Sequence, residues 1–393
     1  MKKSKVAGYA VALAWIVALG VMVYTIVQKH MMIEGTDYSV HAIKAIDIFQ
    51  NGFTGIFQNS AYPIWRIGVK FFERILHFNL FDSAAWTTLL FYVLTYVIIF
   101  YIFCKKLSDR FGYVFCAMVS GILMLVQPIS LEGLTFEVVS GRMLINTWHN
   151  PTNIVARPFG IVAVFLLFEI LNLWENEKKN SFLLYTCFGF SLILANLGKP
   201  SFSQMFVPAV AIYFIGYCVC HKFRNFNFCF YLALSIVPSL GVLLLQTVLS
   251  FGGGEGGGGV EIAPFAVLGQ SQTNIPLMLI TTLAFPLAVV ITNWKKCVSD
   301  KKVHIAVMMV VVSFLEYAML AEVGKRRYHG NFGWGFKLAI FYFWMLALIE
   351  YCEVIKKEGI NWKVILNGAL LVLHLLCGIG YLWCQLGNDY FWV

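Results

Sequence analysis

Three consecutive cations stand out in the segment EVGKRRYHGNFGWGF, residues 322–336: Lys325, Arg326 and Arg327, followed closely by His329. Apolar runs long enough to cross a bilayer flank this segment on both sides. Ammonium and guanidinium groups gathered in one short loop are typical of phosphate binding, because they donate charge-assisted hydrogen bonds to phosphate oxygens. We therefore expect these four side chains to bind a phosphate group.

A candidate catalytic carboxylate lies near the N-terminus in EGTDYSVHAIKA, where Asp37 precedes His41 by four residues. One helical turn separates the two side chains if a helix begins there. A carboxylate at a helix start near the membrane surface is well placed for a catalytic role. Thr36 or Asp37 is equally suited to be the N-cap of that helix, and the two roles are compatible.

Polar and aromatic side chains in other connections suggest a site for a sugar, since sugars are gripped by stacking and hydrogen bonds. The segment SGRMLINTWHNPTNIVARPF lies between two apolar runs, and HGNFGWG precedes another. The Asn-Pro pair in the first segment also reads as a turn, with Thr152 as a helix cap. The predicted substrate-binding residues are His41, Arg142, Trp148, His149, Asn150 and Trp334.

Two further cations join the predicted phosphate site. Arg157 lies just inside an apolar run, where a charge is costly unless it is partnered, so a functional role is the default expectation. Lys199 lies in LGKPSF, a very short turn between apolar runs. Its ammonium either reaches the membrane surface along its aliphatic stem or binds the phosphate.

The composition of the chain indicates a polytopic membrane protein. Hydrophobic residues make up 60% of its 393 residues and charged residues 12%, about half the charged share of a soluble domain. In lipid only helices or closed barrels satisfy their own backbone groups, so we expect an all-α bundle. The ten cysteines show no disulfide or zinc spacing, and no feature indicates a cofactor or nucleic acid.

Eleven apolar segments are predicted to span the membrane within one domain of residues 1–393. They lie at 6–28, 84–104, 112–130, 154–174, 182–197, 203–220, 228–248, 275–293, 303–321, 336–352 and 364–384. Of the 29 Lys and Arg residues, 17 fall in every second connection, which marks those connections as cytoplasmic. This places the N-terminus inside and the C-terminus outside. The first segment follows a lysine-rich start and exceeds the usual signal-peptide length, so we interpret it as a retained span.

The same count puts the cations of residues 325–327 outside the cell, against the charge rule for short loops. Bound phosphate is the most economical reason for their presence there. The alternative is that one span is miscounted and that this loop is cytoplasmic.

The first extracytoplasmic loop, residues 29–83, is predicted to hold two amphipathic helices lying in the membrane interface. In YPIWRIGVKFFERILHF the apolar residues recur with helical spacing, and basic residues line the other side. A shorter helix, near residues 39–49, shows the same separation. We expect the apolar sides to face the membrane and the basic sides to face anionic headgroups.

This arrangement resembles the GT-C superfamily of integral membrane glycosyltransferases: a first span, an outer loop with an early acid, two interfacial helices and then a bundle of about ten spans. The segment TDYSVHAIKA…YPIWRI is similar to the Asp-containing first-loop motif and the following Tyr-Pro segment of bacterial members. The match at the level of residues covers roughly the first 80 positions, and the rest agrees in topology only.

The resemblance implies an inverting transfer of a sugar from a polyprenyl-phosphate or pyrophosphate donor to a glycan, lipid or polymer acceptor on the outer face of a bacterial plasma membrane. It implies that Asp37 is the general base. Some subfamilies carry paired acids, but here Glu34 lies three residues earlier rather than adjacent. Metal dependence and subfamily therefore stay open.

Two other functions compete with this interpretation. A polysaccharide polymerase or O-antigen ligase would use outer arginines and a histidine without an acid, although such enzymes have their largest outer loop later in the chain. A lipid or sugar transporter would be expected to show internal repeats and charges near the membrane midplane. Loss of activity in an Asp37→Asn variant favours the glycosyltransferase.

Overall fold

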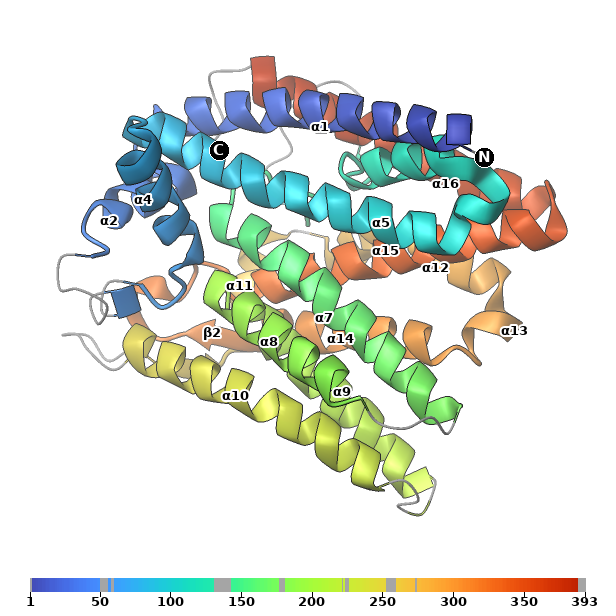
Figure 1. Ribbon diagram of the computed structural model, residues 1–393. Coiled ribbons are helices and arrows are strands. Elements are labelled where there is room, and N and C mark those ends of the chain that lie inside the picture. Colours follow the sequence, from blue (N-terminus) through green and yellow to red (C-terminus); the bar gives the residue numbers. More distant parts are fainter. Residues whose placement is uncertain are drawn as a thin grey trace.

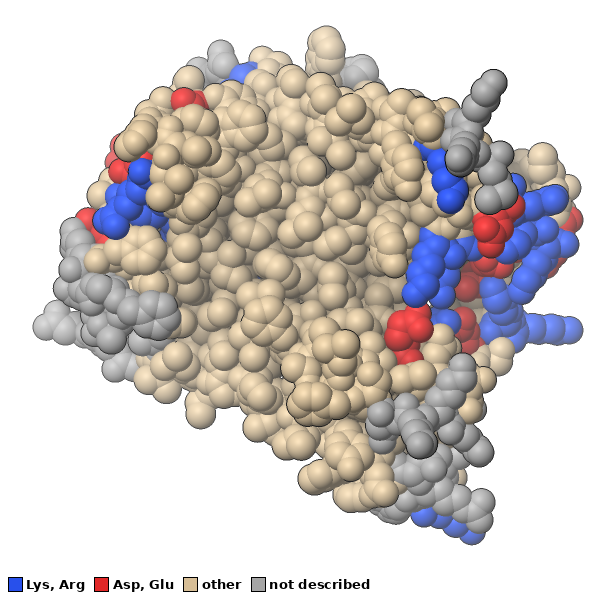
Figure 2. All heavy atoms as spheres, viewed as in Figure 1, with Lys and Arg blue, Asp and Glu red and all other residues tan. Residues whose placement is uncertain are grey.

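The chain folds into one bundle of long helices with a cap of short elements at one end (Figure 1). This computed structural model describes residues 2–49, 56–57, 60–130, 143–176, 181–220, 222, 226–251, 259–272 and 274–387. Figure 2 shows a broad belt without charged side chains between the two ends of the molecule, with most of the visible cations at the end opposite α2 and α4. The protein is a nearly all-helical polytopic membrane protein.

The elements follow one another along the chain in a simple order. The first half contains α1 (Lys2–Met31), α2 (Asp37–Ile46), α4 (Ile64–Leu76), α5 (Leu80–Leu123), α7 (Pro151–Glu175), α8 (Phe182–Gly198), α9 (Ser201–Cys220) and α10 (Phe226–Phe251). The second half contains β1 (Val260–Ile262), α11 (Ala266–Ser271), α12 (Ile275–Thr292), α13 (Trp294–Cys297), α14 (Lys301–Met319), β2 (Leu320–Glu322), the 3₁₀ turn η1 (Gly324–Arg326), α15 (Gly333–Glu358) and α16 (Trp362–Gly387).

Nine helices of the described residues are long and apolar enough to cross a membrane. α8 is shorter, with 17 residues. α5 is broken at Gly112, whose φ of 78° and ψ of 170° are not helical. The two arms of α5 pack side by side. The Tyr92 hydroxyl, from the first arm, donates to the carbonyl of Met124, at the end of the second arm, at 2.9 Å. The predicted total of eleven spans counts both arms and α8, and it stays a prediction.

The third predicted span, residues 112–130, differs from the structure in its second half. The helix ends at Leu123, and the chain continues without helical structure to residue 130. This backbone is buried and its polar groups are paired inside the protein: the Gln127 amide nitrogen donates to the His374 carbonyl at 3.2 Å, and Asn146 Nδ2 donates to the Val126 carbonyl at 3.0 Å. Such backbone is tolerated at membrane depth only where protein surrounds it.

The two helices of the first loop exist, but the structure corrects which side of each faces outward. On α4, Arg66 and Lys70 are buried, whereas Phe71 and Ile75 are more than half exposed. On α2, His41 is buried and Ile43 is exposed. Part of each apolar side therefore points away from the bundle, and Arg66 and Lys70 point into it, opposite to the expectation that these cations meet headgroups, whereas Lys44 and Arg74 are exposed. The buried cations have polar partners: Arg66 Nη2 lies 3.1 Å from His41 Nδ1, and Lys70 pairs with Glu73 at 2.8 Å.

The cap that lies over this end of the bundle gathers segments far apart in the sequence. β1 and β2 pair antiparallel, with Val260 opposite Glu322. The C-terminal ends of α1 and α8 and the N-terminal ends of α7, α9 and α15 lie in the same region as α2 and α4 (Figure 1). Residues from seven or more elements can therefore contribute to one site at this end.

Candidate functional site

Two helix N-caps, Thr36 of α2 and Asn150 of α7, position the polar residues of the site. Thr36 is the N-cap of α2, because its hydroxyl oxygen accepts from the Ser39 amide at 3.2 Å. Asp37 is therefore not needed as the cap, and its carboxylate is available for other contacts. Asn150, not Thr152, is the N-cap of α7, and its Oδ1 accepts from the Asn153 amide at 2.8 Å.

The side-chain amide of Asn150 also links Asp37 to Lys199. Its Nδ2 donates to Asp37 Oδ2 at 2.6 Å. Its Oδ1 accepts from Lys199 Nζ at 3.1 Å, and the same ammonium donates to the Thr152 hydroxyl at 2.8 Å. The structure thus brings together Asp37, Asn150 and Lys199, three residues that the sequence separates by more than 100 and by 49 positions.

Close packing of α8 against α7 holds Lys199 in this position. Gly198 lies so near the start of α7 that a Cβ atom would meet the Ala156 backbone at 3.0 Å. Lys199 follows in the short connection to α9 and is 7% exposed. Burial, together with the positive charge of Lys337, lowers the pKa of Lys199 to about 7, and the negative charge of Asp37 opposes this shift. The ammonium is therefore held in its charged form only weakly at neutral pH.

A second lysine shares an aromatic ring with the first. Lys199 Nζ lies 4.4 Å from the centroid of the Trp334 ring, and Lys337 Nζ lies 4.1 Å from it. Both come so close because α15 begins against α9: a Cβ atom on Gly335 would meet the Ser201 carbonyl at 3.1 Å. Two ammonium groups thus lie against the Trp334 ring, which the sequence suggested would stack on a sugar.

Histidine side chains border this group of charges and are held neutral. The His149 ring centroid lies 5.7 Å from that of Trp334. Burial lowers the pKa of His149 well below its ordinary value, and the charges of Lys337 and Lys199 lower it further. His41 Nδ1 lies 3.1 Å from Arg66 Nη2, and burial with the Arg66 charge likewise lowers the pKa of His41. Because both imidazoles are neutral, the positive charge in this region comes from the lysines and arginines.

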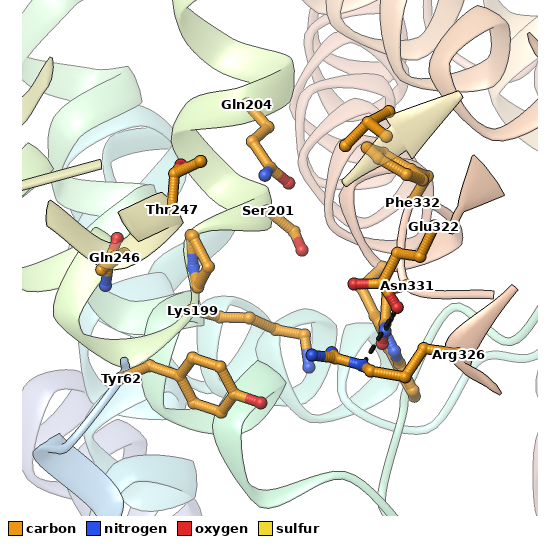
Figure 3. A pocket seen from close by; sticks show the side chains of 13 residues that line it. Tyr62, Lys199, Ser201, Gln204, Gln246, Thr247, Glu322, Arg326, Asn331 and Phe332 are labelled. Atoms are coloured by element: carbon orange, nitrogen blue, oxygen red, sulfur yellow. Dashed lines mark hydrogen bonds and ion pairs between the residues drawn. The ribbon is translucent and has the colours of Figure 1, made fainter. Parts of the chain in front are cut away.

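A pocket of about 140 Å³ opens beside Lys199 (Figure 3). It lies between the start of α9, the end of α10 and the segment from β2 to α15. The residues that line it are Tyr62, Lys199, Pro200, Ser201, Gln204, Gln246, Thr247, Val260, Glu322, Arg326, Asn331, Phe332 and Trp334. Asp37 does not line the pocket, but Asn150 connects it to Lys199, which does.

The structure divides the three consecutive cations among different surroundings. Arg326 lines the pocket, and its Nε lies 3.2 Å from the Glu322 carboxylate. Arg327 pairs instead with Glu261 at 3.0 Å and does not line the pocket. Lys325 is exposed. One of the three, rather than all of them, therefore lies beside Lys199.

His329 is exposed and does not line the pocket either. Arg142 lies outside the described residues. Of the predicted phosphate-binding residues, Lys199 and Arg326 line this pocket among the residues that the structure describes.

Two predicted site residues lie in the core instead. Arg157 is 1% exposed, and its guanidinium donates to Asn146 Oδ1 at 2.9 Å and covers the Phe341 ring at 4.2 Å. Trp148 is 1% exposed, and its Nε1 donates to the Tyr92 hydroxyl at 2.9 Å while its ring stacks on Tyr381. Both hold the non-helical backbone near residues 145–148 in place, so neither offers a surface to a substrate.

A Trp148→Ala substitution is therefore expected to act on stability. Removing a buried tryptophan costs about 3–5 kcal/mol, since a cavity replaces its packing contacts. We expect the purified variant in detergent to melt at a lower temperature while its remaining folded fraction binds ligands as the unmodified chain does. A normal melting temperature with weakened ligand binding would contradict this role.

Sequence reasoning missed several residues of this region. Lys337 lies just inside the predicted span 336–352 and was given no role in the site. Tyr62 occurs in the Tyr-Pro pair before α4 and gave no signal of its own. Gln204 and Gln246 lie inside apolar runs, where a lone glutamine is the available signal for a buried polar contact.

Within the described part of the chain, no group of three or more His, Cys, Asp and Glu side chains could hold a metal ion. Comparison of the chain with protein-family models gives no match, and comparison with curated proteins gives none either.

Proposed function

We propose that this protein is a membrane glycosyltransferase of the GT-C kind, which transfers a sugar from a polyprenyl-phosphate donor to an acceptor hydroxyl with inversion. The observation that carries the proposal is the placement of one carboxylate, Asp37, near two largely buried lysines: Asn150 links Asp37 to Lys199, and Lys199 and Lys337 share the Trp334 ring. Surplus positive charge in a buried place is costly unless an anion joins it. A lipid-linked phosphate is an anion that arrives from the membrane.

The chemistry requires the two kinds of group to act on opposite ends of one bond. The acceptor hydroxyl oxygen attacks the anomeric carbon, and Asp37 takes its proton. The bond between that carbon and the phosphate oxygen breaks, and its electron pair stays on the phosphate. Lys199 and Lys337 stabilise this growing negative charge more in the transition state than in the ground state. A single displacement inverts the anomeric configuration.

The proposed orientation puts this end of the bundle outside the cell. Supporting it, the opposite end carries paired surface lysines, among them Lys105 beside Glu169 and Lys356 beside Glu353. An excess of Lys and Arg in short connections marks the cytoplasmic side. The eleven-span topology follows if α8 and both arms of α5 cross the membrane.

Activity with a defined substrate tests the proposal most directly. The purified chain, incubated with polyprenyl-phosphate sugars and candidate acceptors, is expected to release polyprenyl phosphate in proportion to new glycosidic bonds. Binding of the donor without release, or transport of it across a vesicle membrane, would reject glycosyl transfer and favour the transporter.

Arg326 and Arg327 provide a matched pair of neighbouring variants. Arg326→Gln removes a charge from the pocket beside Lys199 and is expected to lower kcat/KM by about 10–100-fold, the value of one charge-assisted hydrogen bond. Arg327→Gln removes an equal charge from an equally exposed side chain that pairs with Glu261 and does not line the pocket, and it is expected to change kcat/KM by less than about twofold. Equal effects of the two substitutions would contradict a phosphate site centred on this pocket.

A further inference from the structure

An apolar groove of about 750 Å³ lies between α1 and α5, which pack side by side (Figure 1). Lining residues from Ile16 to Thr25 of α1 form one wall, and those from Trp86 to Val93 of α5 form the other. Gly20 places no side chain in the groove. Val21 of α1 is 65% exposed, so the groove opens toward the membrane rather than into the bundle.

Both walls of the groove continue into a polar residue at the same end. On α5, Asp82 lies one helical turn before Trp86, and on α1, Gln28 lies one turn after Tyr24. Residues four apart share a face of a helix, so both polar residues extend the faces that line the groove. They meet there, because Gln28 Nε2 donates to Asp82 Oδ1 at 2.9 Å. The groove therefore has an apolar body and a polar end.

Neutral donors hold the carboxylate at the polar end. Asp82 Oδ1 also accepts from the Tyr24 hydroxyl, which belongs to a groove-lining residue, and Oδ2 accepts from Asn79 Nδ2 at 2.8 Å. No lysine or arginine in the described part of the chain pairs with this half-buried acid. A carboxylate can accept about four hydrogen bonds. Asp82 thus keeps room for one more donor, and a cationic donor would also balance its charge.

Aromatic rings surround the polar end of the groove. The Trp86 ring centroid lies 6.3 Å from that of Tyr24 and 6.2 Å from that of Phe78. The Phe78 ring in turn stacks on Phe72 of α4, which also lines the groove. Tryptophan and tyrosine are enriched at the depth of lipid head groups, and aromatic faces attract ammonium groups. The polar end therefore suits a head group and the apolar body suits a hydrocarbon chain.

The length of the groove matches one leaflet of a bilayer. From Ile16 to Thr25 the wall rises by nine helical steps, or about 14 Å at about 1.5 Å per residue. One leaflet contributes about 15 Å, half of the hydrocarbon core. An acyl chain of a single-leaflet lipid therefore fits from end to end, whereas a long polyprenyl chain would extend beyond the groove.

We propose that this groove binds a membrane phospholipid with a primary ammonium head group, such as phosphatidylethanolamine. Its acyl chain lies between α1 and α5, and its ammonium group donates to Asp82. The proposal goes beyond the proposed function and does not depend on it, because neither helix contributes a residue to the pocket at Lys199.

Lipids with identical acyl chains test the selection of the head group. The full chain in detergent is titrated with phosphatidylethanolamine, phosphatidylcholine or phosphatidylglycerol, and bound lipid is measured by native mass spectrometry. We expect the first to bind at least about tenfold more tightly than phosphatidylglycerol, which has no ammonium group. Phosphatidylcholine should also bind less tightly than the first, because its ammonium has no N–H donor. Equal affinities of the three lipids would overturn the proposal.

Asp82→Asn tests the acid with little change of shape. The variant is expected to bind phosphatidylethanolamine and phosphatidylglycerol with affinities within about twofold of each other, because it offers the ammonium group no negative charge. Glu34→Gln is the matched control, since Glu34 is an exposed acid at the same end of the protein, and it should keep the preference. A preference that survives in Asp82→Asn would be evidence against this site.

Val21→Trp tests the groove without altering the acid. A tryptophan there fills the groove and is expected to weaken binding of phosphatidylethanolamine at least about tenfold, by excluding its acyl chain. Val6→Trp is the matched control, because Val6 lies on the same helix outside the groove and is 68% exposed, against 65% for Val21. Equal affinities of the two variants would place the lipid elsewhere.

A competition experiment distinguishes the other candidate occupant. Polyprenyl phosphate is added to the chain loaded with phosphatidylethanolamine. We expect it to leave the bound phospholipid in place at equimolar concentration. Displacement in the unmodified chain, with polyprenyl phosphate binding weakened by Val21→Trp, would assign the groove to the polyprenyl tail and reject the proposal.

Discussion

Asp37→Asn is expected to lower the rate of sugar transfer by about 10²–10⁴-fold, the usual contribution of a general base. Asparagine has nearly the same shape as aspartate and still offers an oxygen to Asn150 Nδ2, which now donates to Asp37 at 2.6 Å. The fold should therefore persist, while the group that takes the acceptor proton is lost. The measurement is kcat with a saturating lipid-linked donor.

The charge of Asp37 also helps to keep Lys199 protonated, because it opposes the fall in the pKa of Lys199. The variant should therefore be assayed well below neutral pH, where Lys199 is charged in both chains. Glu34→Gln is the control, since Glu34 is an exposed acid three residues away. An Asp37→Asn enzyme with normal kcat would instead favour a polymerase or ligase that works without an acid.

Lys199→Gln is expected to lower kcat/KM by about 10²–10³-fold, the effect of removing one donor to a developing negative charge. The ammonium is already committed to Asn150 and Thr152, so its position is set before a substrate arrives. Lys325→Gln is the control, because Lys325 is an exposed lysine at the same end of the protein.

Lys199 should also affect the pH dependence of kcat/KM. Its pKa of about 7 means that the free enzyme loses this positive charge as the pH rises through neutrality, so kcat/KM should fall above about pH 7. In Lys199→Arg the guanidinium stays charged, and that fall should disappear even if the rate is lower. An identical decline in both chains would assign the pH dependence to another group.

The linkage to folding has a definite sign. Between a pKa of about 7 in the folded chain and the ordinary value in the unfolded chain, the unfolded state binds more protons. The contribution of Lys199 to the free energy of unfolding therefore increases as the pH rises through this window. Anion binding and folding thus respond to pH in opposite directions at this residue.

The helices could be predicted from the sequence because their signal is long and uniform. Apolar runs of about twenty residues have no alternative in lipid but to be helical, and every predicted segment overlaps a helix. The early end of α5 was not predicted, although Pro128 is a local signal against a helix. The position of this end at Leu123 depends on distant partners such as His374 and Asn146, which pair with the backbone of residues 126–127.

The site was predictable only where a residue had one plausible environment. Asp37 and Lys199 are charges beside apolar runs, and the structure brings both to the Asn150 amide. Charge alone could not distinguish Arg326 from Arg327, because their roles depend on whether Glu322 or Glu261 is the neighbour. Trp148 looked like a sugar platform, but its partners lie on α5 and α16, far away in the sequence.

The inward cations and outward apolar side chains of α4 have a consequence for how the protein should be handled. Arg66 and Lys70 are buried while Phe71 and Ile75 of the same helix are more than half exposed, so the thickness of one helix separates buried charge from the apolar exterior. A lipid-linked substrate can keep its apolar tail in the membrane while its charged head group enters the site. We therefore expect kcat to be lower in short-chain detergent micelles, which displace the surrounding lipid, than in lipid nanodiscs.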